Sequence, residues 1–429
     1  MPANGEHPEP LAELQAWLES NWSPDLSVGE WWERLGLSGW AAPALPENAY
    51  GRGISIGDAI RAVRVIRQFG ALGPPGGLGL LLAAPTIAVH GNQEQIDRYV
   101  ADIVTGRMNW CQLFSEPNAG SDLAGLQTQA VADGDEFVVN GQKVWTTGGH
   151  WADLGMLIAR TDPGAPKHQG ITYFAFDMRQ PGVEVRPLRE MTGRALFNEV
   201  FFTDARVAAD AVIGPLNGGW TVANTTLAFE RAGLGAGGSG AEGLVPGKAA
   251  GFMERRAGDF VRTDSTRSTG LGMGARQLIE LARTTGGSAD PNLRQELAHL
   301  YSLEEIGRFM GLRFKAAKAA GSDIPGLPNM SKLGMSELMR RYRDIGLRLV
   351  GPLGMLHAYN AEDRAALDAA TGQPVLSALT ETALFAQGPS IYGGTDQIQR
   401  NLLGERTLGL PREPGPDRAT PFRDLPKNR

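Results

Sequence analysis

The hydrophobic pattern of this chain changes twice along its length, and these changes limit the folds open to it. From Leu11 to about Gly106, apolar residues recur at helical spacing, and Gln93 to Val104 has the pattern of an amphipathic helix. Short alternating or β-branched stretches follow, and the helical spacing returns from Gly219 onward. The order of helices, then strands, then helices predicts segregated layers of an α+β protein instead of alternating βαβ units.

The same changes divide the chain into three expected domains. They are an N-terminal helical domain over 1–106, a middle β-barrel-like domain over 107–217 and a C-terminal helical domain over 218–429. A long helix is expected over Met330–Val350, and a last helix through Asp396–Glu405. Strands are expected at Trp110–Phe114, Glu136–Val139, Lys143–Thr147, Gly155–Ala159, Thr172–Asp177 and Glu199–Phe202, with hairpin turns at Asp133-Gly134 and Asn140-Gly141.

A Gly-rich insertion at about 233–274 interrupts the C-terminal domain. Its segment 235–240, GAGGSG, has the letters of a dinucleotide-binding fingerprint. A helical stretch precedes this segment, whereas a dinucleotide site needs a strand there to direct the following helix at the pyrophosphate. A flexible connection or a lid is the plainer interpretation.

Composition excludes several classes of function. The 41 Lys and Arg residues against 47 Asp and Glu residues make the chain mildly acidic, which argues against nucleic acid as a partner. The single cysteine, Cys111, excludes an intramolecular disulfide and a multi-cysteine metal site, and no metal is expected. The apolar run from Leu78 to Val89 is too short to span a membrane. We therefore expect a cytoplasmic protein.

Two segments far apart in the sequence carry the most specific pattern. Phe114 to Asp122 reads FSEPNAGSD, and Ile391 to Asn401 reads IYGGTDQIQRN. Together they resemble the two signatures of the acyl-CoA dehydrogenases, and the similarity extends over nearly the whole chain, in a bacterial-like form. The resemblance implies a three-part fold with a C-terminal helical bundle, FAD as cofactor and an acyl-CoA thioester as substrate.

The resemblance also assigns expected roles in flavin binding to the first signature and to a later segment. Phe114 and Ser115 are expected at the edge of the flavin ring, and Ser121 at the phosphates of cofactor or substrate. Lys143 to Thr147 resembles the family's Trp-x-Thr segment, in which the Trp145 ring packs on the isoalloxazine and the Thr147 hydroxyl bonds its reactive edge. An ordinary hairpin at 114–122 and a core role for Trp145 are the alternatives.

Further cofactor contacts are expected from a neighbouring subunit. Gly351-Pro352-Leu353-Gly354 resembles the turn whose backbone meets the pyrophosphate of the neighbour's FAD, and Thr395 and Gln397 match positions on the adenosine half. A homotetramer or homodimer is therefore expected, with a heterotetramer as another possibility. The family's Arg-x-x-Phe-Gly stretch is not recognisable, which leaves Arg283 and Arg294 as weak candidates for the pyrophosphate, and Arg348 stands where Gln is common.

The second signature lacks the residue that matters most for catalysis, because Gly393 occupies the usual place of the catalytic glutamate. A subset of the family, similar to the isovaleryl and long-chain dehydrogenases, keeps Gly there and carries the glutamate on the first helix of the C-terminal domain. Glu230 falls at that position. Ala223, Thr226 and Leu227 share its helix face, which is small or apolar. The alternative is a surface ion pair.

The implied reaction is the α,β-dehydrogenation of an acyl-CoA to the 2-enoyl-CoA. Glu230 would take the α-proton, the backbone N–H at Gly393 would help bind the thioester oxygen, and the β-hydrogen would pass as hydride to flavin N5. Electron-transfer flavoprotein or a similar acceptor would reoxidise the flavin. The alternatives are a non-catalytic or partner-dependent subunit of a heteromeric acyl-CoA dehydrogenase, and a related flavin oxidase.

Overall fold

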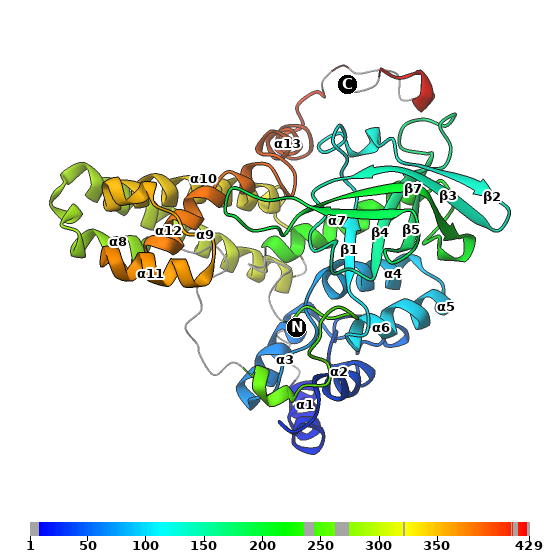
Figure 1. Ribbon diagram of the computed structural model, residues 1–429, viewed down its shortest axis with the longest axis horizontal. Coiled ribbons are helices and arrows are strands. Elements are labelled where there is room, and N and C mark those ends of the chain that lie inside the picture. Colours follow the sequence, from blue (N-terminus) through cyan, green and yellow to red (C-terminus); the bar gives the residue numbers. More distant parts are fainter. Residues whose placement is uncertain are drawn as a thin grey trace.

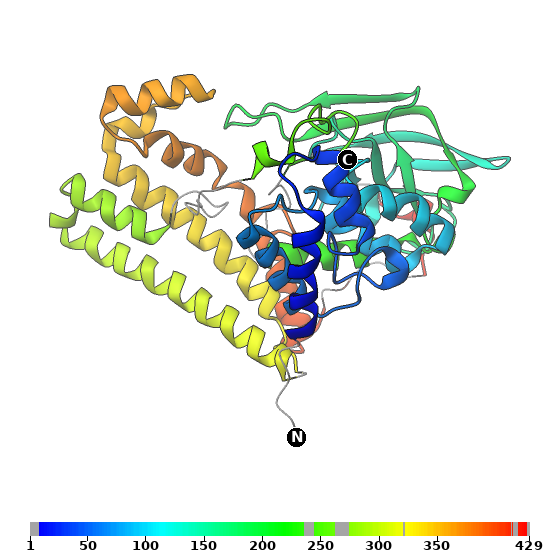
Figure 2. The same cartoon turned by 90° about the horizontal axis from the view of Figure 1, so that it is seen from below.

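The computed structural model describes residues 8–235, 244–261, 274–320, 322–412, 414 and 419–426 of the 429-residue chain. It has an N-terminal helical part, a β-sheet and a C-terminal helical bundle that extends away to one side (Figures 1 and 2). The predicted α+β class is confirmed. Among the described residues, no helix is both long enough and apolar enough to cross a membrane.

The N-terminal helices are anchored by buried tryptophans. Trp31 and Trp32 are fully buried, and their indole N–H groups donate to the carbonyl oxygens of Leu72 and Gly73, at 2.7 and 2.9 Å. The predicted helix over Gln93–Val104 is continuous but contains a π-helical turn. The helical elements are α1 (Pro8–Asn21), α2 (Val28–Leu37), α3 (Ile56–Phe69), a π-turn (Gly79–Ala83), α4 (Ala84–His90), α5 (Gln93–Gln95), a π-turn (Ile96–Val100) and α6 (Ala101–Val104).

A mostly antiparallel sheet of seven strands forms the middle of the described chain, in the order β1-β4-β2-β3-β7-β6 with β5 on β4. Strands β1 and β4 are parallel and pair from Trp110 to Leu113. Two of the strands, β2 and β6, are absent from the sequence prediction. The bounds are β1 (Trp110–Leu113), β2 (Gln129–Asp133), β3 (Glu136–Lys143), β4 (Leu154–Arg160), β5 (Ile171–Asp177), β6 (Val183–Pro187) and β7 (Asn198–Ala208).

One predicted turn and one predicted strand are wrong. Asn140-Gly141 lies inside β3 as a bulge against β7, and a Cβ on Gly141 would approach the backbone of Thr128 to 2.7 Å, so glycine serves close packing there. The predicted strand over Lys143–Thr147 is only the end of β3, because Trp145 has a positive φ that strands do not allow. The Asp133-Gly134 hairpin is confirmed.

The C-terminal helices form a bundle, and α10 confirms the long helix expected before Gly351. Helix α13 is shorter than predicted and continues as a π-helical turn, Leu403–Thr407. The helices are α7 (Gly219–Gly235), α8 (Ala275–Thr284), α9 (Pro291–Ala319), α10 (Leu327–Val350), α11 (Ala361–Thr371), α12 (Leu376–Phe385) and α13 (Asp396–Leu402).

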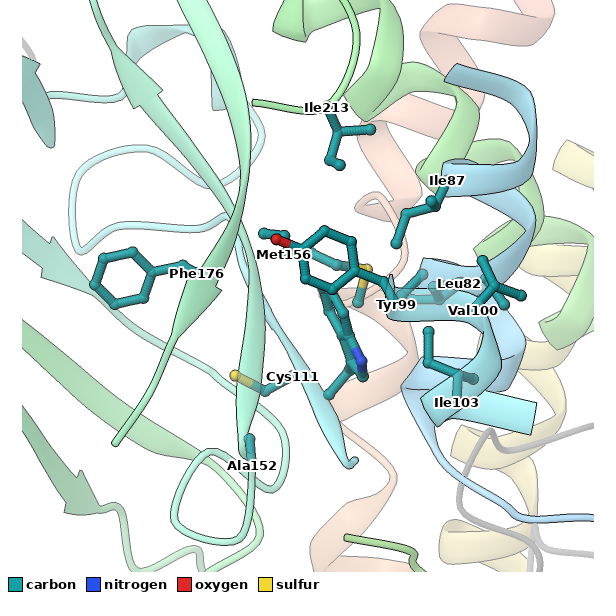
Figure 3. Packing of buried hydrophobic residues seen from close by; sticks show 14 of the residues in the cluster. Leu82, Ile87, Tyr99, Val100, Ile103, Cys111, Ala152, Met156, Phe176 and Ile213 are labelled. Carbon is teal, nitrogen blue, oxygen red and sulfur yellow. The ribbon is translucent and has the colours of Figure 1, made fainter. Parts of the chain in front are cut away.

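Two separate hydrophobic cores hold the described chain together. The larger core joins the N-terminal helices to the sheet, where Leu82, Ile87 and Tyr99 face Met156 (Figure 3). The smaller core lies within the bundle, among α8, α9, α10 and α12. Helix α7 contributes Val222 and Ala223 to the larger core and packs on β5, α4 and α10, so it lies at the seam between the two cores (Figure 1).

Part of the Gly-rich insertion is held on the N-terminal helices. Residues 236–243 and 262–273 lie outside the described residues, but 244–261 do not. The Val28 N–H donates to the Arg255 carbonyl and the Gly29 N–H to the Met253 carbonyl, both at 2.9 Å. The Gly247 N–H donates to the Gly106 carbonyl. The expectation of a flexible connection or lid is therefore wrong for 244–261. The GAGGSG string follows α7 and no strand, as the sequence indicates.

The position of Cys111 generates a simple prediction. Its thiol is fully buried on β1, and this burial raises the pKa of the thiol to about 12. Because the thiolate is the reactive form, a disulfide reagent such as 5,5′-dithiobis(2-nitrobenzoate) should leave the native protein unmodified at neutral pH and titrate one thiol per chain in denaturant. Rapid modification of the native protein would contradict the packing of Figure 3.

Candidate active site

The two segments predicted to bind the flavin lie side by side at one end of the sheet. Glu116 and Ala119 close a tight turn through two mutual backbone hydrogen bonds of 3.1 Å, directly after β1. The Val144 N–H donates to the Ser115 carbonyl at 2.9 Å, which joins this turn to the segment after β3. The structure therefore brings Ser115 and Trp145, 30 positions apart in the sequence, into one local arrangement.

A buried ion pair holds these two segments together. The Lys143 ammonium, fully buried, donates to the Glu116 carboxylate and to the Phe114 carbonyl, each at 2.9 Å. Glu116 also accepts the backbone N–H groups of Gln127 and Thr128, at 2.6 and 2.9 Å. These hydrogen bonds come from the segments that carry the predicted flavin residues and from the two residues just before β2.

The charges of the pair depend on each other. Burial raises the pKa of the Glu116 carboxyl, but the Lys143 ammonium and the hydrogen-bond donors outweigh burial and hold that pKa below its ordinary value. Burial lowers the pKa of Lys143. Because each charge is removed from water, either one alone would be costly inside the protein.

Trp145 has the clearest signs of a ligand-facing residue. Its backbone is left-handed, with φ of 62°, yet its indole is 61% exposed. Such a conformation is uncommon for a bulky residue and persists only when its surroundings impose it. Here Asn198, fully buried on β7, accepts the Thr146 N–H through its backbone at 3.0 Å and donates to the Thr146 carbonyl through its side chain at 2.9 Å.

The other predicted flavin residues surround this arrangement. Phe114 is buried and packs edge-on to Tyr173 of β5, with ring centroids 6.0 Å apart. Ser115 and Thr147 are half-buried, and Ser121 is exposed. A Cβ on Gly120 would meet no atom within 4 Å, so the loop borders open space. Of these residues, Ser121 and the partly exposed Ser115 and Thr147 are accessible from outside the protein, whereas Phe114 is buried.

Glu230 lies one turn from the end of α7 and faces β1. Its side chain is half-buried, and the Gln112 amide of β1 donates to its carboxylate at 3.4 Å. Burial raises the pKa of the Glu230 carboxyl, while the Gln112 hydrogen bond and the Arg231 charge partly oppose that rise. Ala223 and Thr226 on the same helix face are fully buried. Among the described side chains, none forms an ion pair with Glu230, unlike the usual case of a surface glutamate on a charged helix face.

The second signature forms a loop that is fastened to α10. Gly393 and Gly394 have φ of 62° and 80°, which favours glycine at both positions. The Gln399 amide donates to the Gly393 carbonyl at 3.0 Å and accepts from Asn329 of α10 at 2.7 Å. Thr395 caps α13 through the Ile398 N–H, and Gln397 is exposed.

The remaining candidates lie in the helical bundle. Gly351 and Gly354 form a turn after α10 in which Gly351 is exposed, so its backbone is available to a neighbouring molecule. No described contact joins this turn to Trp145 within the chain. Arg283 pairs with a glutamate on its own helix, Arg294 with backbone carbonyls, and Arg348 with glutamate and aspartate side chains.

Four residues that hold or contact the candidate site were missed by the sequence analysis. Glu116 and Lys143 stand inside the two predicted flavin segments, and opposite charges in two segments expected to meet at one ligand are a signal that could have found them. Gln112 offered a similar signal, since it is the polar residue of the apolar strand Trp110–Leu113. Nothing in the sequence marked Asn198, because its role depends on the register of β7.

Comparison with known proteins assigns the family. Three domain profiles match: the acyl-CoA dehydrogenase N-terminal domain over residues 9–107, the middle domain over 111–205 and the C-terminal domain over 273–408. The chain is 33% identical over 383 residues to acyl-CoA dehydrogenase IpdE1 of Mycobacterium tuberculosis, covering 89% of this chain and 88% of that protein. The chain belongs to the acyl-CoA dehydrogenase family. It is therefore a flavin-dependent oxidoreductase with FAD as its cofactor.

Solved structures of this family have the same fold. The steroid ACAD Tcur3481-Tcur3483 superposes with a TM-score of 0.68 at 25% identity, covering 95% of this chain and 98% of the matched chain. The ChsE4-ChsE5 complex from Mycobacterium tuberculosis gives 0.67 at 25% identity, covering 95% and 99%. Glu230 lies between the matched middle and C-terminal domains, so the family match does not itself identify the base.

The residues present fit a flavin. An exposed indole held in a strained backbone supplies a flat apolar surface, and the neighbouring Thr147 supplies a hydroxyl beside it. The loop at Gly120 also borders open space. By the family resemblance, Phe114, Ser115, Trp145 and Thr147 are the residues that would hold the ring system, and Ser121 a phosphate group.

The buried ion pair generates the second prediction. Lys143→Met should destabilise the protein by roughly 3–5 kcal/mol, because it leaves the Glu116 carboxylate buried without its cation. Adding Glu116→Gln should cost less than the sum of the two single changes. Urea unfolding of the FAD-loaded protein measures both. The control is Lys167→Met, which breaks the partly exposed pair with Asp122 on the same loop and should cost about 1 kcal/mol or less. Equal losses for both lysines would contradict this account.

Proposed function

We propose that this protein dehydrogenates an acyl-CoA thioester to the 2-enoyl-CoA, with Glu230 as the base that takes the α-proton. The observation that carries the proposal is the placement of Glu230. Glu230 lies on α7, the helix between the two cores, and its carboxylate is half-buried. None of the described cationic side chains forms an ion pair with it. Burial raises the pKa of the carboxyl. A general base near neutral pH requires such an environment.

Gly393 completes the proposal because it has no side chain that could act as the base. Its backbone N–H is proposed to donate to the thioester oxygen as negative charge develops there, a role that needs no side chain. Gln399 and Asn329 hold the loop that presents this N–H. FAD, when bound, accepts the β-hydrogen with its two electrons. Trp145 and Thr147 are proposed to orient the ring for that step.

With Glu230 as the base, we infer that the chain belongs with the subset similar to the isovaleryl and long-chain dehydrogenases. We infer electron-transfer flavoprotein or a similar protein as the electron acceptor. The acyl group remains open between short, branched, long and steroid-derived chains, and the matched steroid ACAD supports including the last class. Anaerobic flavin bleaching by a panel of these acyl-CoAs identifies the preferred one.

The main test of the proposal is Glu230→Gln. The amide is nearly isosteric, so the fold, the flavin spectrum and acyl-CoA binding should persist. Loss of the base should slow anaerobic flavin reduction by roughly 10²–10⁴-fold, measured by stopped-flow absorbance. Reduction at the unmodified rate would show that another group takes the proton.

A double variant tests whether the two positions address the same proton. Gly393→Glu in a Glu230→Gly background should recover part of the lost rate. The recovery should be incomplete, because a misplacement of about 1 Å can cost on the order of 10²-fold. Gly393→Gln in the same background is the matched control, since it adds the same bulk without a base and should recover nothing.

We also propose that the FAD site is completed by a second subunit, through the exposed turn at Gly351 and Gly354. Two of the matched structures, Tcur3481-Tcur3483 and ChsE4-ChsE5, are named for two different chains. Their names support assembly with either an identical or a different chain.

Gly354→Asp, which places a carboxylate near the proposed pyrophosphate, should weaken FAD binding in the oligomer. Ultracentrifugation followed at the flavin absorbance measures the oligomeric state and the amount of bound FAD together. A monomer that binds FAD as tightly as the oligomer would contradict the proposal. If the chain expressed alone fails to assemble, a different partner chain is implied.

A further inference from the structure

Gln112 is the polar group that lies against the proposed base. It belongs to β1, whose other residues, Trp110, Cys111 and Leu113, are buried and apolar. The Gln112 backbone pairs with Met156 of β4, so its side chain is not needed for the sheet. The side-chain amide instead reaches Glu230 of α7, with 3.4 Å between Nε2 and Oε2.

The chemistry of an amide suits this position. Gln112 does not titrate, so its N–H₂ remains a donor at every pH, and a donor stabilises a carboxylate relative to the protonated acid. Burial acts in the opposite direction, because it favours the neutral acid. A base has to be deprotonated before it can act at neutral pH. The Gln112 hydrogen bond favours the deprotonated form and so opposes part of the pKa rise that burial causes in Glu230.

Few other charges face Glu230 from the elements around it. Arg231 follows it on α7, and Arg406 from the turn Leu403–Thr407 acts on Arg231. From α4, His90 bonds the Thr225 hydroxyl, and from β5, Tyr173 bonds the Thr226 hydroxyl. These last two groups bond to threonine side chains of α7, and neither has a described hydrogen bond or ion pair with the carboxylate. Among the described residues, Gln112 is the residue outside α7 that donates a hydrogen bond to the Glu230 carboxylate.

We propose that Gln112 is a positioning residue for the base: it fixes the Glu230 carboxylate against β1 and keeps it in the ionised form that accepts the α-proton. The inference rests on the proposed function, since it assumes that Glu230 is the base. It adds a second residue, from a strand 118 positions earlier, to the proton-abstracting unit.

The test is the pH dependence of anaerobic flavin reduction in Gln112→Met and Gln112→Glu. Methionine keeps the length of the side chain and removes the donor. The acid limb of the rate profile should move up by about one pH unit, because a hydrogen bond to a charged group changes such an equilibrium by roughly tenfold or more. Gln112→Glu should move it further in the same direction, since two carboxylates would share the site.

A control and a second readout separate this role from a structural one. Gln142→Met removes a comparable amide that donates to Glu199 on β7, at 3.0 Å, and should leave the profile in place. The infrared band of the Glu230 acid, isolated by subtracting the Glu230→Gln spectrum, should titrate at higher pH in both Gln112 variants of the FAD-loaded protein.

The outcomes distinguish the two proposals. An unmoved profile and infrared titration in both variants, or an equal loss of rate at every pH, would overturn the role of Gln112 while Glu230→Gln remained inactive. Normal flavin reduction in Glu230→Gln would overturn the base itself. If Gln112→Met failed to retain FAD, the nearly isosteric Gln112→Glu would still decide the matter.

Discussion

The buried pair of Lys143 and Glu116 is the interaction on which the arrangement of the active site depends. It fastens the turn after β1 to the segment after β3, and both segments carry the residues proposed to hold the flavin. The pair is expensive to bury, and its value lies in geometry more than in net stability. Trp145 can hold a left-handed backbone beside it because Lys143 on one side and Thr146 on the other are each held by buried partners.

The site lies where two hydrophobic cores meet. The larger core joins the sheet to α7, whereas the loop at Gly393 is fastened to α10 of the bundle through Gln399 and Asn329. The proposed base on α7 is therefore fixed by the same core that fixes the proposed flavin segments. A base at 393 would depend on a loop held by the bundle. This difference gives a physical reason for a carboxylate at 230 to be well placed relative to the ring.

The local hydrophobic pattern was sufficient to predict the fold and most of its helices and strands, because the spacing of apolar residues follows which side of an element is buried. It failed where long-range contacts decide. Asn140-Gly141 has the letters of a turn, but pairing of β3 with β7 makes it a bulge. The family resemblance indicated Glu230, Trp145 and Gly393 as candidates, and their roles stay predictions. It could not find Gln112 or Asn198, whose functions follow from which strand or helix lies opposite them. The proposed contact between Gly351 and a neighbour's cofactor also involves more than one chain.

The central claim is that Glu230 addresses the α-carbon of the substrate, and a crystal structure with FAD and a non-reactive acyl-CoA analogue tests it most directly. The account predicts a Glu230 carboxylate oxygen about 3–3.5 Å from the α-carbon, with the Gly393 N–H directed at the thioester oxygen. A Glu230 side chain turned away from the ligand, or a different carboxylate at the α-carbon, would contradict it.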